Sequence, residues 1–207
     1  MLTIDQVLLR WPETTAEEWR NEGEAWVHIK AKIEPGAALG FNSAIGPYAE
    51  IGSGAKIGSY AKIGSDAKIG PYAAIGPYAE IGSGAEIGSG AKIGPYAKIG
   101  SDAKIGSDAK IGSYAKIGPY AKIGPDAVFA CSPLQIQGTK FLCYHAGPGL
   151  AGIGCEVHPI ERWFSDGDDI ARRHGQSFAA LEAEYRPYME LIRQRDAQLF
   201  PPDKAEM

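Results

Sequence analysis

Hydrophobic and polar positions alternate with a fixed period of six residues through the central part of the chain. Fifteen aliphatic-Gly pairs follow one another without insertion from Leu39 to Ile123. The same phase reaches Val27 and Ile33 on one side and Phe129 on the other, so eighteen hexads fit between Val27 and Phe129. A short period kept over this length is typical of a solenoid built from stacked repeats.

Each hexad predicts one short strand followed by one corner. In the hexad that starts at Ala61, Ala61 and Ile63 are two residues apart with Lys62 between them, which is the alternation of a strand with one buried face. The other three positions hold Gly, then Ser or Pro, then Tyr, Asp or Gly, residue types that favour bends. A single strand of this length cannot bury its Ile, but a coil of several hexads directs its Ile side chains at one axis, and the next coil covers them. We therefore predict an all-β solenoid, a parallel β-helix.

The segments before and after the repeats are predicted to cover the two ends of the solenoid. Thr3 with Gln6 and Thr15 with Glu18 have the spacing of capping boxes and predict short helices. The predicted organisation is an N-terminal helical cap over 1–24, the β-helix over 25–130, closing strands with a β-hairpin over 131–164, and C-terminal α-helices over 165–207.

Within the closing segment, strands are predicted at 134–136, 140–145 and 150–158, with the hairpin turn at Gly147–Gly149. A short helix is predicted from Ser165 to Gly175 and a longer amphipathic helix from Ser177. We expect Pro187 to kink or split this helix. Its apolar stripe is expected to pack along the solenoid, against the Tyr residues described below, or against a second copy of the chain.

The motif of an aliphatic residue, Gly, two variable residues, a small residue and one more variable residue resembles the hexapeptide-repeat superfamily. The resemblance covers about half of the chain and implies three hexads per coil and a left-handed winding, hence a left-handed parallel β-helix of about six three-hexad coils. It also implies a transferase-like fold, commonly homotrimeric, in which activity depends on a loop or a His that interrupts the repeat. No His occurs between Ala37 and Ala127, and no hexad carries an insertion.

The tail has a weaker resemblance. The segment from Gly152 to Trp163, with the helices after it, distantly resembles uncharacterised phage and bacterial hexapeptide proteins, and this implies no activity. Every core aliphatic from Ile45 to Ile123 is Ile. Either a recent duplication or consensus engineering, giving a designed protein, explains this regularity.

Charge and composition exclude several classes of protein. The repeats from Ala37 to Val128 carry nine Lys against three Glu and four Asp, a net of +2, which leaves −6 for the ends. Neither part is basic enough to indicate nucleic acid. No apolar stretch approaches the ~20 residues of a membrane span, and a cytoplasmic location without a membrane partner is expected. The three Cys residues do not indicate a disulfide framework.

Few residues are candidates for chemistry. His145 and His158 are the catalytic candidates, and Cys155 with His158 forms a two-ligand fragment of a metal site, so neither a metal nor a cofactor is predicted. His28 is expected to face outward. Residues eighteen apart lie above one another, and one such column is a candidate contact surface. Exposed aromatic rings more often pack on a neighbouring segment or subunit than bind a sugar or a planar molecule, which is the alternative here. The column consists of Tyr60, Tyr78, Tyr96 and Tyr114.

Two functions remain open. The first is a non-catalytic scaffold, a rigid rod that displays its faces or assembles with copies of itself. The alternative is an acyltransferase-like enzyme that uses acyl-coenzyme A at a subunit interface, which rests on the family resemblance alone.

Overall fold

The computed structural model describes residues 3–23, 25–129, 132–138, 140–154, 156–173 and 178–200. The chain forms two compact units. The first contains Met1–Tyr120 with Gly124–Ser132, and the second contains Ala121–Ile123 with Pro133–Met207.

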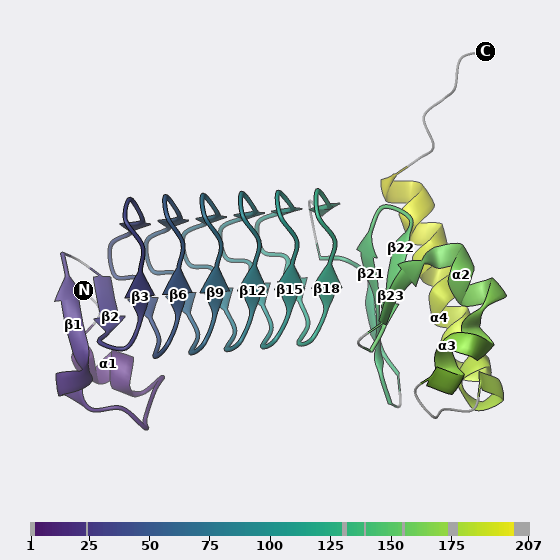
Figure 1. The fold of residues 1–207 in the computed structure, drawn as a ribbon, viewed down its shortest axis with the longest axis horizontal. Helices are drawn as coiled ribbons and strands as arrows, with labels where there is room; N and C mark the ends of the chain where they lie inside the picture. Colours follow the sequence, from purple (N-terminus) through teal and green to yellow (C-terminus); the bar gives the residue numbers. More distant parts are fainter. Residues whose placement is uncertain are drawn as a thin grey trace, which may run out of the picture. The chain divides into compact units, whose positions relative to one another are not determined.

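Three parallel sheets, which we name A, B and C, form the solenoid, and each takes every third strand of the repeats (Figure 1). Ile75 pairs with Ile57 on one side and Ile93 on the other, a step of one 18-residue coil. The predicted solenoid of about six three-hexad coils is therefore confirmed.

The strands of sheet A are, in spatial order, β1 (Trp19–Glu22), β2 (Ala25–His28), β5 (Ala44–Ile45), β8 (Lys62–Ile63), β11 (Glu80–Ile81), β14 (Lys98–Ile99) and β17 (Lys116–Ile117). Those of sheet B are β3 (Lys32–Ile33), β6 (Glu50–Ile51), β9 (Lys68–Ile69), β12 (Glu86–Ile87), β15 (Lys104–Ile105) and β18 (Lys122–Ile123). Those of sheet C are β4 (Ala38–Leu39), β7 (Lys56–Ile57), β10 (Ala74–Ile75), β13 (Lys92–Ile93), β16 (Lys110–Ile111) and β19 (Val128–Phe129).

The repeated Ile and Ala side chains form the solenoid core. Every core Ile from Ile45 to Ile123 is at most 3% exposed. The backbone groups are paired from coil to coil, as when the Lys56 amide donates to the Ala73 carbonyl at 2.8 Å. Each strand of only two residues is therefore held by its neighbours above and below rather than by its own length.

The Gly after each Ile is required by the close approach of the next coil. A Cβ placed on Gly76 would lie 2.5 Å from the Pro95 nitrogen and 2.7 Å from the Gly94 carbonyl carbon. The corner two residues later has a different requirement, because its residue adopts a left-handed backbone, with φ of 59° at Tyr78 and 68° at Gly84. Two positions of the hexad are thus explained by two separate steric demands.

The N-terminal cap contains α1 (Ile4–Leu8), the 3-10 helix η1 (Ala16–Glu18) and strand β1. Both predicted capping boxes are present. The cap also contains a strand that the sequence did not predict, because the chain after Glu18 returns as β1 and pairs antiparallel with β2. A strand at this place uses the backbone groups at the edge of sheet A that the first coil would otherwise leave unpaired. Three side chains of the cap form one buried cluster with Ala44 of the solenoid, namely Val7, Trp11 and Trp19.

The second unit has an antiparallel sheet, which we name D, and helices that pack on it. Its elements are β20 (Gln135–Gln137), β21 (Leu142–Gly147), β22 (Leu150–Ile153), β23 (Glu156–Pro159), α2 (Ile160–Ser165), α3 (Gly167–Arg173) and α4 (Phe178–Leu199). The hairpin of β21 and β22 is confirmed.

Three details of the second unit differ from the prediction. The single strand expected over 150–158 is two strands, because Gly154 turns the chain with a φ of 60°. The helices begin at Ile160 rather than Ser165, and α4 continues through Pro187 without a split. The predicted boundaries at Gly175 and Ser177 lie outside the described residues.

The apolar stripe of α4 packs within the second unit. Tyr185, Met189 and Ile192 are buried in one cluster with Cys143 and Ala151 of sheet D. The expectation that this stripe lies against the Tyr column or against a second copy is therefore wrong, because sheet D offers a nearer apolar surface.

Candidate functional site

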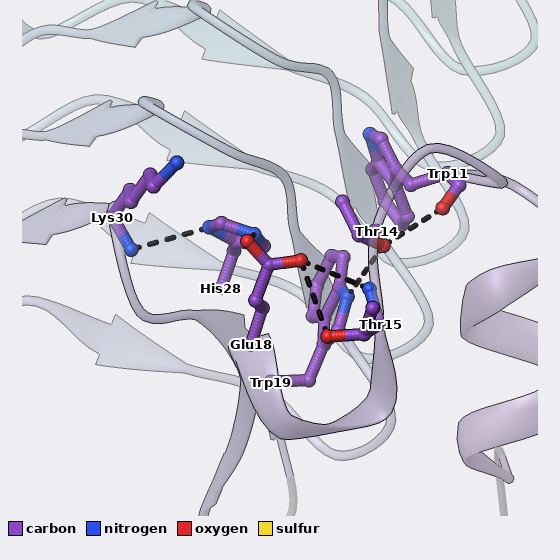
Figure 2. A network of polar contacts seen from close by, with 7 residues as sticks. All are labelled: Trp11, Thr14, Thr15, Glu18, Trp19, His28 and Lys30. Atoms are coloured by element: carbon purple, nitrogen blue, oxygen red, sulfur yellow. Dashed lines mark hydrogen bonds and ion pairs between the residues drawn. The ribbon is translucent and has the colours of Figure 1, made fainter.

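The cap holds a network of polar and aromatic side chains at the start of the solenoid (Figure 2). The indole nitrogen of Trp19 donates to the Thr14 hydroxyl at 2.9 Å, and that hydroxyl donates to the Trp11 carbonyl at 2.7 Å. The indole of Trp11 donates to the Ser65 hydroxyl at 3.1 Å. The first two bonds hold the cap together, and the bond to Ser65 fastens it to the coils.

His28 lies at the centre of this network and is 1% exposed. Its Nδ1 accepts a hydrogen bond from the Lys30 amide at 3.2 Å, and its Nε2 lies 4.0 Å from a carboxylate oxygen of Glu18 (Figure 2). This Nε2 has no hydrogen-bond partner among the described residues. Because Nδ1 is an acceptor, the neutral imidazole carries its proton on Nε2.

The pKa values of this pair reflect their surroundings. Burial lowers the pKa of His28, although the charge of Glu18 opposes the shift. The pKa of Glu18 is also lowered, mainly because its carboxylate accepts the Thr15 amide at 2.9 Å. The expectation that His28 faces outward is wrong, because β1 and η1 cover that side of the first coil.

The predicted Tyr column forms a ladder of parallel rings. The centroids of successive rings from Tyr60 to Tyr114 are 4.7, 4.8 and 4.9 Å apart, with interplanar angles of 5°, 2° and 2°. Tyr78 and Tyr96 are each 43% exposed. Burial of its hydroxyl and the neighbouring rings of Tyr60 and Tyr96 raise the pKa of Tyr78.

The stacking limits what this ladder can bind. The two inner rings, Tyr78 and Tyr96, have a neighbouring ring over each face, so they offer ring edges and hydroxyl groups. A planar ligand therefore has no open ring face at these two positions. The role of the ladder as a contact surface stays a prediction.

His145 is fully buried at the contact between sheet D and α4. Its Nε2 lies 2.7 Å from Oδ1 of Asp196, and the same oxygen accepts the Gly149 amide at 2.8 Å. One carboxylate of α4 thus holds both the strand and the turn of the hairpin. A substrate has no access to this imidazole, so the geometry gives His145 a structural task.

His158 is the more accessible candidate, with 13% of its side chain exposed. Its Nε2 lies 2.9 Å from Oε2 of Glu156, and its ring packs edge-on against Trp163 with the centroids 5.2 Å apart. His145, Ala151 and His158 are in register across three strands, so the histidines are two strands apart, about 10 Å. They do not form a pair.

Of the three cysteines, the structure describes Cys143, whereas Cys131 and Cys155 lie outside the described residues. Burial raises the pKa of the Cys143 thiol to about 12, so the nucleophilic thiolate is disfavoured there. Among the residues that the structure describes, no group of three or more His, Cys, Asp or Glu side chains is placed to hold a metal ion.

Sequence reasoning missed the contact between His28 and Glu18. The capping box placed Glu18 at the end of a turn, which was the only available signal. Nothing in the local pattern indicated that Trp19–Glu22 returns along β2, and that return is what buries His28.

Comparison with known families concerns the repeats. The model described as "Bacterial transferase hexapeptide (six repeats)" matches residues 60–95, 84–119 and 96–131. This chain is a hexapeptide-repeat protein. The matched hexads contain the Ile residues that form the core of the solenoid. The residues that define the family motif are therefore the ones that the packing of the coils requires.

Several solved structures are similar to this hexapeptide-repeat protein. The acetyltransferase domain of PglB from Neisseria gonorrhoeae, in complex with acetyl coenzyme A, is 21% identical over 53% of this chain and 50% of that chain, with a TM-score of 0.45. A mutant GDP-perosamine N-acetyl transferase from Caulobacter crescentus, in complex with CoA and GDP-perosamine, is 20% identical over 64% and 57%, with a TM-score of 0.46. A UDP-N-acetylglucosamine acyltransferase from Francisella novicida is 29% identical over 50% and 46%, with a TM-score of 0.36.

The chain spans about half the length of these solved proteins. A comparison with curated protein sequences gives no match. Across the described part of the chain, no helix combines the length and the apolar character needed to cross a bilayer.

Proposed function

We propose that this hexapeptide-repeat protein is a rigid, non-catalytic scaffold that presents regular columns of side chains to a partner. The observation that carries the proposal is the unbroken register of the coils. Each sheet continues from strand to strand at a step of 18 residues, as in the pairing of Ile63 with Ile81 and of Ile81 with Ile99.

This regularity opposes catalysis for a physical reason. A catalytic site needs side chains of different chemistry held at one place, whereas a repeat gives the same few side chains at every coil. The two most buried histidines, His28 and His145, are enclosed by the cap and by α4. What the solenoid offers is a stiff surface whose columns, such as the Tyr ladder, keep a fixed spacing.

A second candidate function is acyl transfer from acyl-coenzyme A at the interface of a homotrimer. The family comparison supports acyl transfer more than it supports the scaffold, because the description of the matching family model names bacterial transferases. His158 is the residue that would act as the general base, since its ring is partly exposed and Glu156 lies beside it.

One measurement separates the two functions. Molecular mass is measured by light scattering, and melting temperature is measured with and without acetyl-coenzyme A. The scaffold predicts an unchanged melting temperature and no release of free coenzyme A with amino sugars as acceptors. A trimer that is stabilised by the cofactor, and whose coenzyme A release is lost in His158→Ala but kept in Glu17→Ala, would establish the enzyme instead.

A coil deletion gives a positive test of the scaffold. Deleting residues 73–90 removes β10, β11 and β12, and every later strand then rejoins the sheet to which it belonged. We expect a shorter solenoid that still melts cooperatively. Deleting only residues 73–78 shifts each later strand to another sheet and breaks the columns. Equal behaviour of the two deletions would contradict the claim that the coil is the functional unit.

A further inference from the structure

The outward side of sheet C differs in charge from the other two faces of the solenoid. We name it face C, and its outward residues are Ala38, Lys56, Ala74, Lys92, Lys110 and Val128. On sheet A, Glu80 lies between Lys62 and Lys98 at 3.5 and 3.4 Å, and on sheet B, Glu86 binds Lys104 at 2.8 Å. Face C has no such glutamate.

The lysines of face C therefore keep unneutralised charge. Within the described ranges, no ion pair involves Lys56, Lys92 or Lys110, and the last two are direct register partners on adjacent strands. Asp108 and Asp126 occupy the corners before β16 and β19, and neither forms an ion pair with these lysines. Like charges on neighbouring strands repel, so an anionic occupant would stabilise this arrangement.

Between these lysines the surface is apolar. A shallow groove of about 400 Å³ follows face C from β7 to β19. Apart from the three lysines, its lining residues are Ile, Gly, Ala, Val and Phe, and Val128 is 47% exposed. Ala74 opens a gap between Lys56 and Lys92, because its side chain is much shorter than that of either lysine. The occupant that fits has an apolar stripe with carboxylates beside it.

The backbone of sheet C indicates the form of that occupant. Its amides already donate from coil to coil, as Ala74 does to Ala91 and Lys92 to Ala109, both at 2.8 Å. A face with paired backbone groups offers no partners to an added strand, so a helix, which pairs its own backbone groups, fits this face better. Five strands span about 19 Å, the length of about 13 helical residues. Glu residues seven apart on a helix rise about 10 Å, similar to the two-coil step from Lys56 to Lys92.

We propose that face C binds an acidic amphipathic helix of a partner polypeptide, laid along the solenoid axis. The lysines pair with its carboxylates, and its apolar stripe covers Ala74, Val128 and the lysine stems. This inference rests on the proposed scaffold function and names the chemistry of the partner.

The test uses the full chain and a fluorescent synthetic peptide of about 14 residues, with Leu at helical i, i+3, i+4 and i+7 spacing between Glu residues. Binding is measured by fluorescence anisotropy at physiological ionic strength. The face C variant is Lys56→Glu/Lys92→Glu/Lys110→Glu, and the matched control on sheet A is Lys62→Glu/Lys98→Glu/Lys116→Glu. Both carry the same change of net charge, and circular dichroism checks that each keeps its fold. If the Glu variant of face C unfolds, the variant Lys56→Gln/Lys92→Gln/Lys110→Gln replaces it in the binding assay.

We expect the face C variant to bind the peptide at least about tenfold more weakly and the control to change by less than about threefold. Equal weakening in both variants would overturn the proposal, as would equal binding of a scrambled peptide of the same composition. Equally tight, face-independent binding of single-stranded DNA would also overturn it, because that result indicates non-specific attraction of polyanions. If the peptide does not bind to face C and no coenzyme A is released, the helix-binding proposal fails and the scaffold function is unaffected. If coenzyme A is released, the scaffold function itself is refuted.

Discussion

Replacing Ile87 with Asp places a carboxylate in the interior of the solenoid. Ile87 is 3% exposed and pairs in register with Ile69 below and Ile105 above. Its neighbour Glu86 lies on the same two-residue strand but points outward, where it binds Lys104 at 2.8 Å. The strand alternation therefore predicts opposite results for the same new residue at two adjacent positions.

The magnitude follows from what each change removes. Loss of the buried Ile side chain alone costs about 2 to 5 kcal/mol, as in Ile→Ala substitutions. An unpaired carboxylate in the core adds several kcal/mol more, so the total approaches the ~5 to 15 kcal/mol stability of a whole domain. Glu86→Asp shortens the side chain and so weakens an exposed ion pair, which costs at most about 1 kcal/mol.

The assay is thermal and urea unfolding of the two variants, followed by circular dichroism. Hydrogen exchange then shows whether Ile87→Asp unfolds the solenoid throughout or opens only the adjoining coils, since each coil contacts only its neighbours. Similar unfolding curves for Ile87→Asp and Glu86→Asp would refute the inward assignment of Ile.

Three further predictions concern the packing of coils, the cap and the second unit. Gly76→Ala should destabilise the solenoid by about 1 to 3 kcal/mol in urea unfolding, because its Cβ meets the backbone of the next coil. The free energy of unfolding should fall as pH drops through 6.5, the ordinary pKa of His28, because burial lowers the pKa of the folded imidazole and the unfolded chain binds the proton first. The slope from this one group is at most about 1.4 kcal/mol per pH unit. Asp196→Ala should destabilise the second unit by about 1 to 3 kcal/mol in urea unfolding, because it removes the acceptor of buried His145.

Each of these predictions has a control. Ser101→Ala alters an exposed corner and should leave stability unchanged; a cost equal to that of Gly76→Ala would argue against the close approach of coils. His28→Gln should remove part of the pH dependence, and an identical pH profile in this variant contradicts the buried neutral imidazole. Asp169→Ala is the exposed counterpart of Asp196→Ala, and equal effects would show that the His145 contact adds no stability.

The sequence predicted the arrangement of the Tyr residues but not the surroundings of the histidines. Residues eighteen apart do stack, so the alignment of the Tyr rings from Tyr60 to Tyr114 followed from counting along the chain once the family resemblance had given three hexads per coil. The surroundings of the histidines did not, because their partners are distant in sequence. His145 is 51 residues from Asp196, and the burial of His28 depends on the return of β1.

The sequence by itself determined the solenoid, its six-residue period and which side of each strand is buried, and the family resemblance added the three hexads per coil. A strict repeat makes every long-range contact a copy of its neighbour, so the period and the number of hexads per coil together specify the tertiary pairing. Only the tertiary structure decided the ends, where the chain is not periodic. There the strand β1, the packing of α4 on sheet D and the enclosure of His28 and His145 depend on which unpaired edge or apolar surface lies nearest, and no local pattern contains that information.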